Sequence, residues 1–213
     1  MLPNNPDKSL PKNVLVISDG RIHPPLIGRF WLRNMLMEKQ GFGFSWVHSM
    51  EKLPNMDLDG FHGMVLYFHH KEISEAALDA FDSFINDGGG ALALHSATAS
   101  YKDQKRFTDI LGGKFTGHGP VTAFNMMPAS TTSPIFGCIS EFQVVDELYL
   151  HDLQPDIDVH FNALYKGQKI PTVWTRLHGD GRVCYACPGH RAASMRVPSY
   201  QRLLSRALTW ITQ

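Results

Sequence analysis

Gly88-Gly89-Gly90-Ala91-Leu92-Ala93-Leu94-His95-Ser96-Ala97 is the stretch that decides the fold we expect for this chain of 213 residues. Four apolar residues between the glycines and His95 are too few for a helix and fit a strand buried in a parallel sheet. Ala93 and Ala97 flank His95 as at a sharp strand-to-helix elbow, where bulkier neighbours would clash. Ligands bind beyond the carboxyl ends of such strands, so we expect His95 to reach a functional site. The alternative is a histidine that ends a core strand with a satisfied hydrogen bond.

The first half of the chain alternates buried strands with amphipathic helices. Continuous apolar runs predict strands at residues 13–18, 44–48 and 63–68, and apolar periodicity predicts a helix at 26–40. Ser74 is a natural N-cap for a second helix that Gly88 can close. The order βαββαβ predicts an α/β fold with a doubly wound, mostly parallel sheet and helices on both faces. The loops after Ser18, Phe68 and Leu94 should then meet at one edge and bring together His23, His69, His70 and His95.

The second half is less regular and predicts an antiparallel elaboration of that sheet. We expect helices at residues 104–111 and 199–212, a glycine-bracketed loop at 114–120 that carries His118, and strands at 121–127, 141–145, 159–165, 171–176 and 182–187. No linker interrupts residues 13–213, so we predict a single domain there, after a disordered, proline-rich leader at residues 1–12.

The composition excludes several classes of partner. Lys plus Arg and Asp plus Glu both number 20, so no basic field favours nucleic acid or an anionic membrane. Neither an export signal nor an apolar stretch of membrane-spanning length is present, which predicts a cytoplasmic protein. The three cysteines are therefore expected to be reduced thiols. The number of histidines, 11, is unusually high. Their positions matter because histidine suits metal binding and proton transfer near neutral pH.

Several segments together resemble the ThuA-like (trehalose utilisation) proteins. They are Gly88-Gly89-Gly90 through Leu94-His95-Ser96-Ala97, Leu111-Gly112-Gly113-Lys114-Phe115 with His118, Asp146-Glu147-Leu148-Tyr149, Val173-Trp174-Thr175-Arg176 with Gly181-Arg182-Val183, and Gly189-His190. The resemblance extends from about Asn13 to the C-terminus. It implies a flavodoxin-like fold similar to the class I glutamine amidotransferase domain, and a role in sugar catabolism that involves oxidised (keto) disaccharides and glycosides.

The same resemblance argues against amidotransferase chemistry. In glutamine amidotransferases the elbow carries a cysteine thiolate that a histidine from a later strand end activates, whereas here His95 occupies the elbow. None of the three cysteines follows a strand and a small-residue turn. His190 stands where the histidine base of that family would stand, but Ala192 replaces the acid two residues further on. The mechanism is therefore not inherited with the fold.

The remaining polar residues predict a histidine-lined site at the carboxyl edge of the sheet. The candidate catalytic residues are His95, Glu147, His190, His118 and Ser96, and the candidate substrate-binding residues are His23 and Tyr67. Histidines beside a carboxylate can transfer protons at a sugar hydroxyl or at the carbon next to a carbonyl. They can equally hold a zinc or manganese ion that polarises a keto group, and the long spacing leaves both readings open.

Simpler roles remain open for several of these residues. His118 can be an exposed loop residue, and Glu147 can cap an element or pair with Arg176. Ser96 is a weaker nucleophile candidate because His95 takes the elbow position. Cys184-Tyr185-Ala186-Cys187 matches C-x-x-C, but residues three apart in a strand face opposite sides, so core packing is favoured over redox or metal chemistry. Gly88 to Gly90 lack dinucleotide-site spacing, so no cofactor-binding residue is assigned.

Two functions follow as hypotheses. The first is an enzyme that acts on a sugar, keto-sugar or glycoside through this site, and the second is a non-catalytic carbohydrate-binding or regulatory domain. A small-molecule carbohydrate is the expected partner in both, and association of identical chains is left open.

Overall fold

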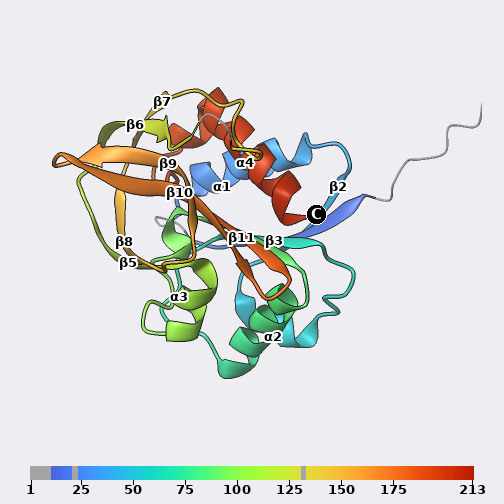
Figure 1. Ribbon diagram of the computed structural model, residues 1–213. Helices are drawn as coiled ribbons and strands as arrows, with labels where there is room; N and C mark the ends of the chain where they lie inside the picture. Colours follow the sequence, from blue (N-terminus) through green and yellow to red (C-terminus); the bar gives the residue numbers. More distant parts are fainter. Residues whose placement is uncertain (1–10, 21–23, 131–132) are drawn as a thin grey trace, which may run out of the picture.

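The computed structural model describes residues 11–20, 24–130 and 133–213, and a nine-stranded mixed sheet runs through its centre (Figure 1). The strands are, in sheet order, β2 (Phe42–Val47), β1 (Lys12–Ser18), β3 (Gly63–Tyr67), β4 (Gly90–Leu94), β11 (Gly181–Ala186), β10 (Gln168–His178), β9 (Asp158–Tyr165), β6 (Thr122–Pro128) and β7 (Phe142–Asp146).

The strands from β2 to β11 form the parallel half of the sheet. Val14 to Ile17 in β1 and all five residues of β4 are buried, as expected for strands covered on both faces. This confirms the predicted α/β class and the strand assigned to the glycine-rich stretch.

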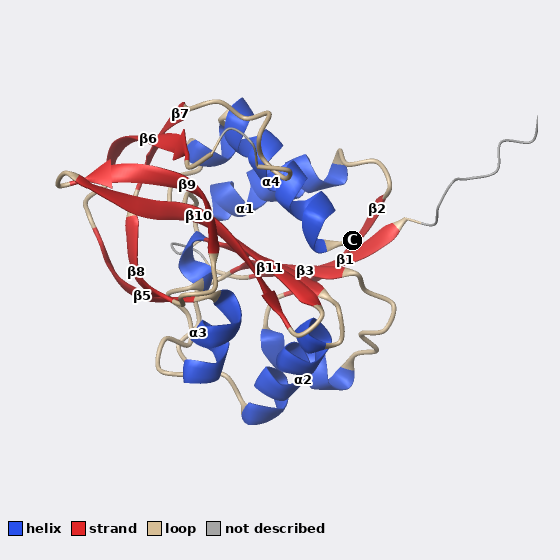
Figure 2. Cartoon of the chain, in the orientation of Figure 1, coloured by secondary structure: helices blue, strands red, loops and turns tan. Residues whose placement is uncertain are grey.

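Helices cover both faces of the parallel half (Figure 2). α1 (Leu26–Met37) and α4 (Pro198–Ile211) lie on one side, and α2 (Glu75–Asn86) and α3 (Lys105–Leu111) lie on the other. The predicted N-cap is confirmed, because the Ser74 hydroxyl accepts a hydrogen bond from the Ala77 N–H at 3.3 Å. Gly90 must be glycine, because a Cβ there would lie 1.9 Å from the Ile211 carbonyl oxygen of α4.

The antiparallel half contains one feature that the sequence did not predict. A loop was expected at residues 114–120, but residues 114–118 belong to β5 (Gly113–His118), which pairs with β8 (Tyr149–Leu153) in a separate two-stranded sheet. The expectation was wrong because Gly113 and Gly117 weaken the strand signal, and the pairing partner lies more than 30 residues away. This strand pairing fixes His118 at the end of β5.

Short 3₁₀ helices complete the fold at residues 50–55, 95–97 and 194–196. Residues 1–10 of the expected leader lie outside the described residues, and the strand that follows begins at Lys12. Among the described residues, no helix is both long and apolar enough to span a membrane. The single domain over residues 13–213 stays a prediction.

Candidate functional site

His95 occupies the expected elbow at the carboxyl end of β4. It begins the 3₁₀ helix His95–Ala97 directly after the strand, and its φ of +45° is a left-handed conformation that is uncommon for residues other than glycine. The tight turn also constrains the facing loop, because a Cβ on Gly189 would lie 2.5 Å from the His95 Cβ. The Thr98 hydroxyl holds the turn by donating a hydrogen bond to the His95 carbonyl at 3.1 Å.

The His95 ring has a defined orientation. Its Nδ1 lies 2.9 Å from the Cys187 carbonyl oxygen, which can only accept a hydrogen bond, so Nδ1 carries the proton. The Tyr149 ring packs against it with a centroid separation of 4.0 Å. His95 Nε2 therefore faces Glu147, and the side chain is fully buried rather than projecting into solvent.

Glu147 is the centre of the site. Its Oε2 lies 3.6 Å from His95 Nε2 and 3.4 Å from His190 Nδ1, and its Oε1 lies 3.7 Å from His118 Nδ1. The residue is only 8% exposed. Three of the four predicted histidines thus surround one buried carboxylate, although they come from the ends of three different segments of the chain.

Asp146, which was not among the candidate site residues predicted from the sequence, holds the backbone of Glu147 and of the His190 loop in place. Its fully buried carboxylate accepts hydrogen bonds from the backbone N–H groups of Glu147 (2.8 Å), Gly189 (3.2 Å), His190 (3.0 Å) and Arg191 (3.1 Å). Burial raises the pKa of Asp146, and these donors oppose that shift by stabilising the anion. One side chain therefore ties the end of β7 to the loop after β11.

A pocket of about 490 Å³ opens onto Glu147 and His118. Tyr101, Phe115 and Tyr149 give it aromatic walls, and its outer rim carries His69, Lys71, Lys102 and Asp103. Burial and the Glu147 carboxylate both raise the pKa of Tyr149, so its phenol stays protonated. The volume lies within the range of about 300–1,000 Å³ that small-molecule sites occupy.

His118 stands at the mouth of this pocket with 42% of its side chain exposed. Its Nδ1 lies 2.8 Å from the Gly119 carbonyl oxygen and is therefore the protonated nitrogen. In the neutral ring the acceptor lone pair is on Nε2. His118 is thus exposed, as one of the two predictions for it stated, but it also lies next to the Glu147 carboxylate.

The other candidates have different surroundings. Tyr67 is fully buried and donates its hydroxyl proton to the Gly189 carbonyl, so it supports the His190 loop and offers no surface to a substrate. Ser96 is 1% exposed, and among the described residues its hydroxyl has no hydrogen-bond partner. His23 lies outside the described residues. His70 bonds Asp19 at 3.1 Å, so the loops after β1 and β3 meet as expected.

Two alternative readings of the sequence are also decided by contacts. Arg176 pairs with Asp156 at 2.8 Å and not with Glu147. Cys184 and Cys187 are both buried, and burial raises the pKa of Cys187 to about 12, which leaves it a neutral thiol. The Cys187 sulfur accepts the Tyr149 N–H at 3.4 Å. These contacts favour the packing role.

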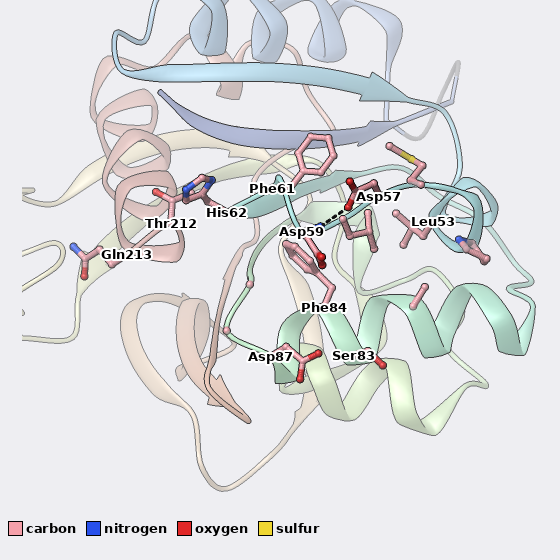
Figure 3. Close-up of a pocket in the computed structure, with 16 residues that line it drawn as sticks. Leu53, Asp57, Asp59, Phe61, His62, Ser83, Phe84, Asp87, Thr212 and Gln213 are labelled. Atoms are coloured by element: carbon pink, nitrogen blue, oxygen red, sulfur yellow. Dashed lines mark hydrogen bonds between the residues drawn. The ribbon is translucent and has the colours of Figure 1, made fainter. Parts of the chain in front are cut away.

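A larger hollow of about 730 Å³ lies at the opposite edge of the sheet, next to the amino ends of β3 and β4 (Figure 3). Asp57, Asp59 and Asp87 line it together with Phe61 and Phe84. Parallel sheets bind their ligands at the carboxyl edge. The smaller pocket beside Glu147 is therefore the better candidate.

Comparisons with known proteins agree with this fold. The family model ThuA, described as trehalose utilisation, matches residues 13–211. A search of curated protein sequences found no match. Among solved structures, a ThuA-like protein of Bacteroides uniformis aligns over 99% of this chain and 95% of its own, with a TM-score of 0.80 and 19% identity. A ThuA-like protein of Parabacteroides merdae aligns over 95% and 90%, with a TM-score of 0.83 and 19% identity.

A cytoplasmic protein of Salmonella typhimurium LT2 is similar over 94% of this chain and 100% of its own, with a TM-score of 0.72 and 11% identity. At these identities the structural likeness establishes the fold alone.

Proposed function

Because this chain belongs to the ThuA (trehalose utilisation) family, we propose that it is a carbohydrate-utilisation enzyme that acts on a sugar, keto-sugar or glycoside. The proposal rests on one observation. The Glu147 carboxylate, 8% exposed, lines a pocket of about 490 Å³ and is surrounded by three imidazoles at 3.4–3.7 Å. Such convergence of titratable groups in a cleft is typical of catalytic sites.

The pocket offers what a sugar ring requires. Phe115, with small exposed areas of the nearly buried Tyr101 and Tyr149, provides aromatic surface for the apolar C–H groups of the ring, whereas His118 and Glu147 provide polar atoms for its hydroxyl groups. The volume accommodates a monosaccharide unit of a larger sugar. The aromatic residues therefore seat the substrate beside the polar cluster.

His118 is the group that we assign to proton transfer. Its Nε2 lone pair can take a proton from a sugar hydroxyl or from the carbon next to a keto group, and the same nitrogen can return it. Glu147, 3.7 Å from Nδ1, stabilises the imidazolium formed in between. General acid–base catalysis of this kind contributes about 10²–10⁴-fold to a rate.

The proposed activity does not include glutamine hydrolysis by a cysteine nucleophile, because no cysteine is suitably placed. Cys138 is exposed in a loop, Cys184 lies within β11, and Cys187 is held beside Glu147 and Tyr149. None of them takes the elbow position, which His95 fills. A thiolate nucleophile needs a lowered pKa, and burial raises the pKa of both Cys184 and Cys187.

A substrate screen with two variants tests the proposal. Trehalose, other disaccharides, glycosides and their keto derivatives are incubated with the protein, and products are followed by NMR. We expect turnover that falls by about 10²-fold or more in His118→Ala and in Glu147→Gln. His178→Ala is the control, because His178 pairs with Asp82 far from the pocket. Unchanged turnover in both site variants would contradict the assignment.

The second function is a non-catalytic carbohydrate-binding domain, which is favoured by the complete burial of His95. It predicts that a sugar raises the melting temperature of the protein, that Glu147→Gln weakens this effect, and that no sugar in the screen is converted.

We also propose a cytoplasmic location, supported by the likeness to the cytoplasmic protein of Salmonella typhimurium LT2. Association of identical chains is supported by four exposed apolar side chains on α1, which are Leu26, Ile27, Phe30 and Met37.

A further inference from the structure

We propose that His95, His190 and Glu147 form a binding site for a divalent transition metal, with Zn²⁺ as the ion that fits best. The proposal deepens the proposed function and rests on the same cluster of residues. It does not rest on turnover, because an ion can be bound by a protein that converts no sugar.

The first argument is the spacing of the ligand atoms. A tetrahedral zinc ion holds its ligands at about 2.0–2.2 Å, which separates neighbouring ligand atoms by about 3.3–3.6 Å. Glu147 Oε2 lies 3.6 Å from His95 Nε2 and 3.4 Å from His190 Nδ1. Both separations match two ligands of one ion, and the 3.6 Å contact is too long for a hydrogen bond.

The second argument is the burial of a carboxylate oxygen. Glu147 Oε2 accepts no hydrogen bond from the part of the chain that the structure describes, and it is shielded from solvent. Burial of a carboxylate oxygen without a hydrogen-bond donor is unfavourable, and a bound cation offsets that cost. A metal ion between Oε2 and the two imidazoles supplies that compensation.

The third argument is the orientation of His95. A metal-bound histidine nearly always donates its second ring N–H to a carbonyl or carboxylate, which fixes the tautomer. His95 Nδ1 bonds the Cys187 carbonyl at 2.9 Å, so Nε2 is the nitrogen left to face Glu147. Tyr149 packs against the ring at 4.0 Å and holds its plane.

The fourth argument is the backbone support. The Asp146 carboxylate accepts the N–H groups of both Glu147 and His190, at 2.8 and 3.0 Å. One buried side chain thus fixes two of the three ligands relative to each other. Its negative charge also makes the cluster attractive to a cation.

The ligand set indicates the type of ion. Two imidazoles and one carboxylate suit Zn²⁺ better than Mg²⁺ or Ca²⁺, which prefer oxygen ligands. The three ligand atoms lie within 4.8 Å of one another, so the two imidazoles must move closer by about 1 Å to reach tetrahedral spacing. Three protein ligands leave a fourth position, to which we assign water or a sugar oxygen from the adjoining pocket. An ion there would act as a Lewis acid on a keto oxygen.

Calorimetric titration of Zn²⁺ into protein stripped with EDTA tests the site. We expect one ion per chain, and an affinity that falls by more than about 100-fold in Glu147→Gln and in His190→Ala, beyond the loss typical of an outer-shell change. His178→Ala is the matched control, because His178 pairs with Asp82 at 2.8 Å but belongs to no group of three possible metal ligands among the described residues. The Zn²⁺ affinity of this variant should equal that of the unmodified protein.

A second measurement tests the site in the unmodified protein and therefore does not depend on whether the variants fold. Co²⁺ bound to the unmodified protein in place of Zn²⁺ should give the intense visible absorption of a tetrahedral site with nitrogen ligands. No heat on titration, no such spectrum, or wild-type affinity in both site variants would overturn the metal site.

The two proposals fail in distinguishable ways. Turnover of a sugar by metal-free protein, together with no binding of Zn²⁺, removes the metal site and leaves the enzyme. Zinc binding that depends on Glu147 and His190, without conversion or binding of any sugar, removes the proposed function and leaves the metal site.

Discussion

His151 provides a test of the electrostatics of the interior next to the site. Its Nε2 lies 2.9 Å from the Thr98 hydroxyl, which in turn donates to the His95 carbonyl, so Nε2 is the protonated nitrogen. Its Nδ1 is shielded from solvent and has no hydrogen-bond partner among the described residues. The ring packs between Trp174 and Tyr185 at centroid separations of 5.0 Å.

This burial lowers the pKa of His151 from 6.5 to about 3. As the pH falls below about 6.5, the unfolded chain binds a proton at this residue and the folded chain does not, so stability decreases until the pH approaches the folded pKa. At about pH 5 the loss is about 2 kcal/mol, because the unfolded pKa lies about 1.5 units higher and each unit is worth about 1.36 kcal/mol.

The replacement His151→Gln removes the titration and keeps a donor near the Thr98 hydroxyl. Urea unfolding of both proteins at about pH 7.5 and about pH 5 measures the effect. The unmodified protein should lose about 2 kcal/mol more than the variant between these two conditions. Other histidines, such as His160, whose pKa burial also lowers, are present in both proteins and cancel in the comparison.

Thr98→Val is the control for this comparison. It removes the hydroxyl partner and keeps the buried imidazole, so its overall stability should fall while the pH dependence from His151 is retained. If the free-energy difference between the unmodified protein and His151→Gln is the same at both pH values, the ring is not held neutral by burial and the reasoning is refuted.

The remaining predictions concern the support of the site and the thiols. Asp146→Asn places an amide against several backbone N–H donors. The free energy of unfolding in urea titrations should therefore fall by about 2 kcal/mol, and the Zn²⁺ affinity should fall by about 10–100-fold. An unchanged affinity would show that Asp146 does not organise the ligands. In the thiol assay with a disulfide reagent, folded protein should expose only Cys138, whereas unfolded protein should react at all three cysteines. Rapid reaction of Cys184 or Cys187 in the folded protein would instead support the redox reading.

Local pattern was sufficient to predict the parallel half of the sheet. The run at 13–18 and the stretch from Gly88 to Leu94 are apolar on both faces because helices cover both faces there, so burial is written directly into the sequence. The Ser74 N-cap is equally local, since the hydroxyl bonds an N–H three residues away.

The β5 and β8 strands could not be predicted from the local sequence pattern. Lys114, Phe115 and Thr116 alternate as a strand does, but the surrounding glycines favour a loop, and only pairing with residues 149–153 stabilises the extended form. Asp146 was missed for a similar reason. An acidic residue at a strand end is ordinarily exposed. The backbone N–H groups of residues 189–191, which donate to Asp146, are more than 40 residues away in the sequence, so no local pattern predicts them.

The sequence by itself determined the fold class, the elbow at His95 and the kinds of residue available for chemistry, because these depend on apolar periodicity, small neighbours and composition. Tertiary structure alone decided that Glu147 lies among His95, His118 and His190 at 3.4–3.7 Å. The reason is physical. These side chains project from the ends of separate strands, and their separations are set by parallel pairing of β4 with β11, by antiparallel pairing of β5 with β8 and by the Asp146 carboxylate, none of which acts between neighbours in the sequence.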